Sequence, residues 1–413
     1  MSNLQLKVAV IHIYSFPEGM APTARIMAYC KGLKSLGAEV DILSIRPQKG
    51  KNLPPLQGEC DGGNYYHFCY PPLIKIPLIK SVFWRLRNSF CLWSTLYFVT
   101  KSHKKRPYDA FILSFDAPTT FSCVLPVLSR LKGSKIIAIA DEYPKPIRKY
   151  LKKKVPAWKL WWYKLVYQGI DARILMTEKL QYFYDNNVCF KPTLLLSTIV
   201  DTDRFIDTQP KYTDRDYLCY MGNMELSKDN VDNIIKAFAI IKDEYPKLDL
   251  YMYGSPNSTD RGILTSLIEE LEISDRAIIK GRINYGDVPA VLLGAKVLVA
   301  SQPDTKRAEG GFPTKMGEYF MTGKPCLFTD VGEISTYLKD GVTGYIVTPE
   351  NPVLYAQKLR FILNNYDKAL KTANNAIRFI LDNYSYHSAG EHISDFISQL
   401  KSEKHDKRQI EEQ

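Results

Sequence analysis

The sequence predicts an α/β protein made of two doubly wound domains. Short apolar runs rich in β-branched residues alternate with stretches long enough for helical crossovers, and the alternation stops at a polar segment, residues 201–215, before it restarts. At about 150 residues per domain, the 413 residues also favour two domains. We therefore expect one domain over residues 1–205 and a second over residues 206–385.

The individual elements follow from hydrophobic period and from turn residues such as Gly37, which is placed to end the first helix. In the first domain we expect strand 7–13, helix 24–36 and strands 39–44, 108–114, 135–140 and 172–176. In the second we expect strand 217–221, helix 231–244 and strands 248–253, 277–280, 296–300, 326–329 and 345–347.

The loop after the strand at 296–300 contains the most informative chemistry. Thr314 is placed to cap a helix over Lys315 to Met321, and Lys315 and Glu318, three residues apart, share one face of that helix. Ligands of open α/β sheets bind at carboxyl ends of strands, and helix N-termini attract phosphate. A phosphate-bearing sugar is therefore expected here, contacted by Phe312, Pro313, Thr314, Lys315 and Glu318. An amphipathic helix after a polar loop is the alternative.

Three more loops follow predicted strands. In the first, Gly19 lets the backbone approach a phosphate or sugar, although the spacing is not that of a dinucleotide-binding loop. In the second, Gly222 and Asn223 precede Lys228, which is placed to pair with a phosphate or to stand exposed. In the third, Asp141 and Glu142 are placed to position a sugar hydroxyl, to act as a base or simply to form a capping turn. With Asp116, which follows strand 108–114, they are our acceptor-side candidates.

The composition argues against a zinc-binding protein and against an integral membrane protein. The eight cysteines are scattered, without the paired spacing of a zinc site, so we expect reduced thiols in a cytoplasm. The first residues lack the order of a signal peptide, and no uncharged apolar run reaches the ~18 residues that a membrane span needs. The expectation is a cytoplasmic protein that is not integral to a membrane.

Charge is distributed unevenly. Residues 1–205 hold 30 Lys and Arg against 14 Asp and Glu, a balance of +16, whereas the total is +11. The excess lies in residues 73–106 and 145–164, where basic residues alternate with Trp, Tyr and Phe. This mixture suits the headgroup layer of an anionic membrane. Nucleic-acid binding is a weaker interpretation, because no nucleic-acid module is visible. A third interpretation is that the basic residues form solvated helix faces and the aromatic residues lie in the core.

Short motifs occur in a fixed order along nearly the whole chain: Ser197-Thr-Ile-Val-Asp-Thr-Asp-Arg-Phe205, Tyr220-Met-Gly-Asn-Met-Glu225, Tyr253-Gly-Ser255, Ile279-Lys-Gly-Arg-Ile283, Gly323-Lys-Pro325 and Asp340-Gly-Val-Thr-Gly-Tyr345. Together they resemble the retaining family-4 glycosyltransferases of the GT-B fold, many of which build surface polysaccharides and glycolipids. The resemblance implies two facing domains with a deep cleft, an acceptor-binding first domain, and a last helix, residues 386–403, that returns to it.

The resemblance also implies roles for residues. Lys228 would bind the diphosphate of a sugar nucleotide, Glu318 its ribose, and the main chain around Gly281 and Arg282 its base. Glu309 would contact the donor sugar.

Two positions depart from the family pattern. Asn223 stands where an arginine is common, and Lys315 is expected to supply the missing charge. Eight residues rather than seven separate Glu309 from Glu318, so Glu309 reaches its expected place only if the loop bulges by one residue. Asp201 and Asp203 belong to the linker motif in this alignment, so no metal and no cofactor beyond the donor substrate are expected.

The expected function is transfer of a sugar from a nucleotide-diphosphate donor to a glycan or lipid-linked acceptor, with retention, at the inner face of the cell membrane. The catalytic candidates are Glu309, Lys228, Lys315, Asp141 and Glu142. The alternatives are a sugar-nucleotide epimerase of the same architecture and a catalytically inactive membrane-associated scaffold.

Overall fold

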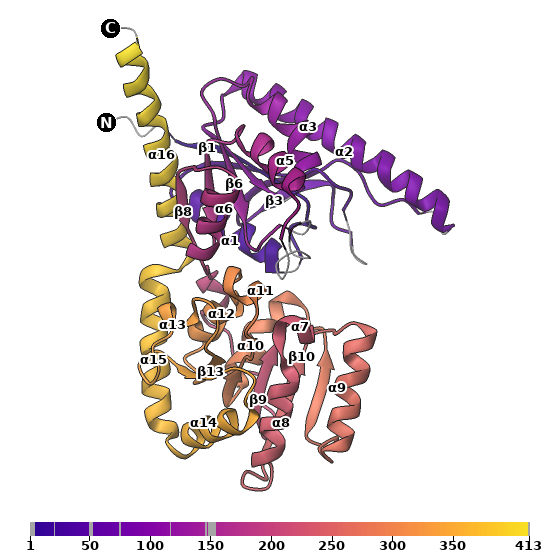
Figure 1. Ribbon diagram of the computed structural model, residues 1–413, viewed down its shortest axis with the longest axis vertical. Coiled ribbons are helices and arrows are strands. Elements are labelled where there is room, and N and C mark those ends of the chain that lie inside the picture. Colours follow the sequence, from indigo (N-terminus) through magenta and orange to yellow (C-terminus); the bar gives the residue numbers. More distant parts are fainter. Residues whose placement is uncertain are drawn as a thin grey trace. The chain divides into compact units, whose positions relative to one another are not determined.

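The computed structural model describes residues 5–19, 21–48, 53–73, 76–115, 117–144, 147 and 154–411. The chain forms two compact units: unit 1 is residues 1–199 with 386–413, and unit 2 is residues 200–385. Figure 1 shows that each unit is a sheet covered by helices.

The sheet of unit 1 has the order β3-β4-β2-β1-β5-β6-β7-β8. Its strands are β1 (Lys7–His12), β2 (Glu39–Ser44), β3 (Gln57–Cys60), β4 (Gly63–His67), β5 (Ala110–Ser114), β6 (Lys135–Ala140), β7 (Ala172–Leu175) and β8 (Thr193–Leu195). All neighbouring pairs are parallel except β3 with β4, which form an antiparallel hairpin at the edge. The central strands are buried throughout and mostly apolar, because helices cover both faces of a parallel sheet.

The helices of unit 1 are α1 (Ala21–Ser35), α2 (Pro77–Lys105), α3 (Pro118–Leu128), α5 (Ala157–Tyr167), α6 (Glu178–Asn187) and α16 (Tyr386–Glu411). Because crossovers between parallel strands are right-handed, this strand order places α2, α3 and α5 on one face of the sheet and α1 on the other. Helix α3 packs against both α2 and α5.

Helix α16 is held on α1 by a close crossing of two glycines. A Cβ atom on Gly32 would lie 2.0 Å from the main-chain oxygen of Tyr386, and one on Gly390 would lie 2.3 Å from the carbonyl carbon of Gly32. Ile393 and Ile397 of α16 are fully buried in the core that also contains strands β1 and β5. The last helix is therefore part of the hydrophobic core of unit 1.

The sheet of unit 2 is parallel, in the order β11-β10-β9-β12-β13-β14. Its strands are β9 (Asp216–Met221), β10 (Leu248–Tyr253), β11 (Ala277–Gly281), β12 (Val297–Val299), β13 (Cys326–Thr329) and β14 (Tyr345–Val347). The strand order reverses between β9 and β12. Ligands of doubly wound sheets bind at such a switch point, outside the carboxyl ends of the strands.

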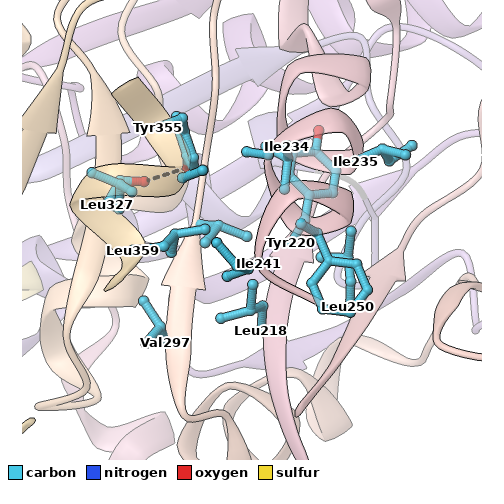
Figure 2. Close-up of a cluster of buried hydrophobic side chains, with 14 of the residues drawn as sticks. Leu218, Tyr220, Ile234, Ile235, Ile241, Leu250, Val297, Leu327, Tyr355 and Leu359 are labelled. Atoms are coloured by element: carbon cyan, nitrogen blue, oxygen red, sulfur yellow. Dashed lines mark hydrogen bonds between the residues drawn. The ribbon is translucent and has the colours of Figure 1, made fainter. Parts of the chain in front are cut away.

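The helices of unit 2 are η1 (Thr202–Phe205), α7 (Leu226–Asp229), α8 (Val231–Ile241), α9 (Ser258–Glu270), η2 (Tyr285–Asp287), α10 (Val288–Gly294), α11 (Lys306–Gly310), α12 (Lys315–Met321), α13 (Ile334–Tyr337), α14 (Pro352–Asn364) and α15 (Tyr366–Asn383). Between α8, α14 and the sheet lies an apolar core, shown in Figure 2. Tyr355 brings its hydroxyl into this core, 3.1 Å from the main-chain oxygens of Ala300 and Leu327. The tyrosine thus ties α14 to the residue that follows β12 and to β13.

The predicted fold class, two doubly wound α/β units, is confirmed. Strands β2, β6, β10, β13 and β14 and helix α12 have the predicted bounds. The hairpin β3–β4 and the short strand β8 were not predicted. Thr314 is the N-cap residue of α12, as predicted, but its dihedral angles are helical and its side chain makes no capping hydrogen bond. The turn begins around Pro313, whose oxygen accepts from the Met316 amide at 2.8 Å.

Candidate functional site

The candidate site of unit 2 begins where β9 and β12 end, at the switch point. Gly222 follows β9, and the loop that follows β12 leads to α11 and α12. The hydroxyl of Tyr319 on α12 accepts from the main-chain amide of Met221 at 2.9 Å. Helix α12 is therefore fixed directly beside the end of β9.

Lys315 occupies the centre of this region. Its ammonium group lies 2.9 Å from Asp229 Oδ1 and 3.2 Å from the hydroxyl of Tyr220, and 4.3 Å from the centre of the Tyr220 ring. Asp229 is 5 % exposed and Lys315 17 % exposed. The lysine is thus partly accessible while its counterion is buried.

The electrostatics of this group keep Asp229 charged. Burial raises the pKa of Asp229, but the charge and hydrogen bond of Lys315 and the charge of Lys228 more than offset it, so the pKa is lowered overall. Burial and Asp229 raise the pKa of Tyr220 far above its usual value. The tyrosine therefore stays protonated, and its hydroxyl can donate to Asp229.

Glycines bring the backbone close to Lys315. A Cβ atom on Gly222 would lie 2.7 Å from the Lys315 ammonium nitrogen and 2.5 Å from the Tyr220 hydroxyl. Gly254 has a φ of +142°, and a Cβ atom there would lie 1.7 Å from the oxygen of Gly222. Gly222 donates to Tyr253 at 3.0 Å and Gly254 donates to Gly281 at 2.8 Å, so the loops after β9, β10 and β11 are joined through their main chains.

Glu318, one turn along α12, has different partners. Its Oε1 lies 2.5 Å from Arg204 Nη1, and Arg204 Nη2 donates to the oxygen of Tyr285 at 2.7 Å. The Arg204 guanidinium also stacks 3.5 Å from the centre of the Tyr285 ring. Arg204 of η1 therefore fixes the Glu318 carboxylate beside the segment that follows β11.

Glu309 lies on the short helix α11, which Thr305 caps by accepting from the amide of Ala308 at 3.3 Å. The side chain of Glu309 is half-buried. Two residues earlier, Arg307 Nη1 lies 2.7 Å from Glu225 Oε1. Arg307 thereby links α11 to the loop after β9 and adds a cation on that side.

The remaining predicted residues of unit 2 are distributed along the same loops. Lys228, on α7, is half-buried next to Asp229, whereas Asn223 is exposed. Phe312 is buried against the ring of Tyr337, with ring centres 4.7 Å apart. The other positions are Pro313, buried; Thr314, half-buried; Gly281, with a φ of +80°; and Arg282, exposed.

In unit 1, the loop after β1 contains Gly19. A Cβ atom there would lie 2.1 Å from the hydroxyl oxygen of Thr23, which itself donates to the oxygen of Ser15 at 2.9 Å. Glycine is therefore needed for this loop to close onto α1.

Asp141 and Glu142 follow β6 and are half-buried. The Asp141 carboxylate lies 3.4 Å from Nε of the buried Arg25, which also donates to the hydroxyl of Tyr29 at 2.7 Å. The predicted acceptor-side Asp141 thus faces a fixed guanidinium. The third acceptor-side candidate, Asp116, lies outside the described residues.

Two buried histidines lie beneath the loop that contains Gly19. His12 Nδ1 accepts from the amide of Tyr14 at 3.1 Å, and the His12 ring is 6.4 Å from that of His67. Burial, with a smaller contribution from His67, lowers the pKa of His12 to about 3. His12 is therefore neutral in the folded protein near neutral pH.

Sequence reasoning missed five residues of the unit 2 site: Tyr220, Asp229, Arg204, Tyr285 and Arg307. Tyr220 and Arg204 stand inside motifs that were recognised, and Asp229 directly follows Lys228. These positions next to recognised residues are the only features of the sequence that could have pointed to Tyr220, Arg204 and Asp229. Tyr285 and Arg307 had none, because their roles depend on contacts across the fold.

No described helix combines the length and the apolar character needed to cross a bilayer. Within the described part of the chain, no group of three or more His, Cys, Asp and Glu side chains is placed to hold a metal ion.

Comparison with known proteins gives a family match for unit 2 and a fold match for the chain. Residues 201–379 match the model of the family described as glycosyl transferases group 1. Among curated proteins, none matches the chain.

Solved structures resemble the chain over nearly its full length. Sucrose-phosphate synthase from Thermosynechococcus elongatus superimposes with a TM-score of 0.73 at 16% identity, covering 96% of this chain and 100% of that one. A glycosyltransferase from Rickettsia africae gives 0.70 at 14% identity, over 96% and 99% of the two chains. Anabaena HepE in complex with UDP gives 0.68 at 12% identity, over 95% and 100%.

At these identities the structural likeness shows the fold, and the family match concerns residues 201–379. The chain has the two-domain GT-B fold, and residues 201–379 match the glycosyl transferases group 1 model.

Proposed function

We propose that this protein transfers a sugar, with retention of anomeric configuration, from a nucleotide-diphosphate donor to a hydroxyl of a glycan or lipid-linked acceptor. The observation that carries the proposal is the position of Lys315. Its ammonium group is held by the buried Asp229 and lies beside Gly222 at the switch point of the unit 2 sheet. A partly exposed cation next to a glycine backbone at that place is suited to a diphosphate.

The difficult step of such a transfer is departure of the diphosphate. Lys315 and Lys228 would stabilise the negative charge that develops on the leaving oxygen, and the exposed side-chain amide of Asn223 would donate a hydrogen bond. Fixed donors of this kind need no reorganisation as charge develops, which makes them effective. Because lysines supply the positive charge, we propose that no metal ion takes part, and that a chelator leaves turnover unchanged.

The nucleoside would lie toward the loop after β11. In this proposal, the Glu318 carboxylate, oriented by Arg204, accepts hydrogen bonds from the ribose diol. The main chain at Gly281 and Arg282 contacts the base. The oxygen of Gly281 accepts a hydrogen bond from the amide of Gly254, which connects it to the loops after β9 and β10. Glu309 contacts the donor sugar.

Unit 1 would bind the acceptor through Asp141, Glu142 and Asp116. We propose that the acceptor belongs to cell-surface polysaccharide synthesis and is reached from the inner face of the cell membrane. The basic excess of residues 1–205 supports this placement, because the inner leaflet is anionic.

The donor can be tested directly. HepE was solved in complex with UDP and UDP-glucose, so uridine-diphosphate sugars are the first donors to screen by thermal shift. A ligand at 100 times its Kd adds about 2.7 kcal/mol of stability. With the donor found, Lys315→Ala and Lys228→Ala are expected to lower turnover by about 100- to 1000-fold each, the usual loss for one fixed donor.

The matched control is Lys236→Ala. Lys236 also forms a lysine–aspartate pair, with Asp232 at 2.8 Å, but that pair lies on the exposed side of α8. Its loss is expected to leave turnover unchanged. Full turnover in both Lys315→Ala and Lys228→Ala would contradict the assignment of the leaving-group site.

The same experiment separates the alternatives. A sugar-nucleotide epimerase would convert the donor to an epimer without an acceptor, whereas a transferase leaves it intact or hydrolyses it slowly. An inactive scaffold would show no saturable binding of any nucleoside diphosphate.

A further inference from the structure

Helix α2 carries an apolar stripe that no described residue covers. Leu86, Phe90, Trp93 and Tyr97 recur at intervals of three and four residues, so they share one face of the helix over three turns. Their exposed fractions are 57 to 69%. The opposite face of α2 packs on the sheet through buried residues such as Cys91 and Thr95. The large apolar side chains of the stripe therefore lie on the face that points away from the sheet.

A second exposed group lies on α5. Trp158 and Trp161 are 60% and 64% exposed. Helix α3 packs against both α2 and α5, and the three helices cover the same face of the unit 1 sheet (Figure 1). The exposed apolar side chains of α2 and α5, here called the α2–α5 surface, therefore extend over more than one helix. Large exposed apolar side chains gathered on neighbouring helices mark an interaction site.

The segments that carry these side chains have charges of one sign only. Residues 73–106, 117–135 and 154–167 contain no Asp or Glu, and Lys80, Arg85, Lys101, Lys104 and Lys105 of α2 are exposed. All five tryptophans of the chain lie on α2 and α5. Tryptophan and tyrosine beside lysine and arginine is the composition that prefers a membrane–water interface.

We propose that the α2–α5 surface docks on an anionic lipid bilayer, with the apolar rings inserted at headgroup depth and the basic side chains against lipid phosphates. A second copy of the chain fits the α2–α5 surface less well than a bilayer does. A symmetric dimer would place the same basic, acid-free surface on both sides, and like charges across an interface are repulsive. The surface also spans two helices, which suits a plane better than a single partner helix.

Binding is tested with the full chain and without donor or acceptor, so the outcome is independent of the proposed glycosyl transfer. The wild-type chain is expected to sediment with vesicles of phosphatidylcholine mixed with phosphatidylglycerol, and to remain in the supernatant with phosphatidylcholine alone. Because all tryptophans are on α2 and α5, their emission is expected to shift to the blue on binding and to be quenched by brominated lipid.

Two variants test the apolar and the basic parts separately. Leu86→Gln/Phe90→Gln/Trp93→Gln is expected to abolish sedimentation. Lys101→Gln/Lys104→Gln/Lys105→Gln is expected to weaken it about 100-fold, since each basic residue near an anionic surface contributes about fivefold. Thermal unfolding of each variant establishes that it is folded.

Matched controls come from unit 2. Ile263→Gln/Val353→Gln/Leu381→Gln removes three apolar side chains that are 47 to 52% exposed, and Lys247→Gln/Lys368→Gln/Lys371→Gln removes three exposed lysines. Both are expected to bind like the wild type. Equal loss in the controls, or failure of the wild type to bind anionic vesicles, overturns the proposal. So does a lipid-free dimer that becomes monomeric only when the α2 stripe is changed.

Discussion

The ammonium group of Lys315 lies 2.9 Å from the carboxylate of Asp229, 86 residues away in the sequence. The pair serves two purposes at once. It neutralises a carboxylate that is 5% exposed, and it fixes a cation beside the glycine loop after β9. Stability and ligand binding should therefore respond differently to changes in this pair.

Replacing Lys315 with Met is expected to lower the free energy of unfolding by about 3 kcal/mol, because it leaves a buried carboxylate without its counterion. Urea unfolding followed by far-ultraviolet circular dichroism measures the change. The double variant Lys315→Met/Asp229→Leu should recover most of that stability yet still fail to bind the nucleoside diphosphate. If the double variant binds as the wild type does, Lys315 has only a structural role.

Glu318→Gln is expected to reduce affinity for the cognate nucleoside diphosphate by about 10- to 100-fold, since hydrogen bonds to a charged group contribute about 1.5 to 3 kcal/mol. Isothermal titration calorimetry measures the loss. A 2′-deoxy nucleotide lacks half of the ribose diol, so its affinity should fall much less.

The matched control for Glu318→Gln is Glu244→Gln, which removes the carboxylate of a surface ion pair between Glu244 and Arg360. That variant should bind both nucleotides normally. Equal losses for the ribo and deoxy nucleotides in Glu318→Gln would place the carboxylate away from the ribose.

Gly254→Ala is expected to destabilise the protein by at least about 2 kcal/mol and to abolish nucleotide binding. The residue has a φ of +142°, and the new Cβ atom would lie 1.7 Å from the Gly222 oxygen, so the main chain of the site must move. Gly262→Ala is the control: Gly262 lies inside α9, has open space around it, and its replacement should stabilise the helix by about 0.5 to 1 kcal/mol. Thermal unfolding and nucleotide titration of both variants check this.

How far the sequence predicts this structure differs between the elements and the site. Strand β10 and helix α12 were predicted to the residue, because each is an apolar run or an amphipathic turn bounded by glycine or proline. The hairpin β3–β4 was missed, since β3 is short and three of its four residues are exposed, which gives no hydrophobic period to detect.

The same limit applies to the site. Lys315, Glu318 and Gly222 were found because they stand in local motifs at strand ends. Their partners Asp229 and Arg204 lie 86 and 114 residues away, and a single sequence contains no signal for which distant charges meet. The predicted cleft between the domains remains a prediction for the same reason: it depends on long-range geometry.

His12 provides a pH test of unit 1. Its pKa is about 3 in the folded chain against 6.5 when unperturbed, so the unfolded chain binds more protons between those values. The stability contributed by neutral His12 is complete above pH 6.5 and decreases as the pH falls toward 3. From pH 7 to pH 5 the loss due to His12 is about 2 kcal/mol.

His12→Gln retains an acceptor for the Tyr14 amide and removes the titration. Urea unfolding followed by tryptophan emission reports on unit 1, where all the tryptophans lie. Between pH 7 and pH 5 the free energy of unfolding of the wild type should fall by about 2 kcal/mol more than that of His12→Gln. Only in the wild type does unfolding expose a His12 ring that then binds a proton. A parallel decrease in both proteins would mean that His12 is charged in the folded state or reaches solvent.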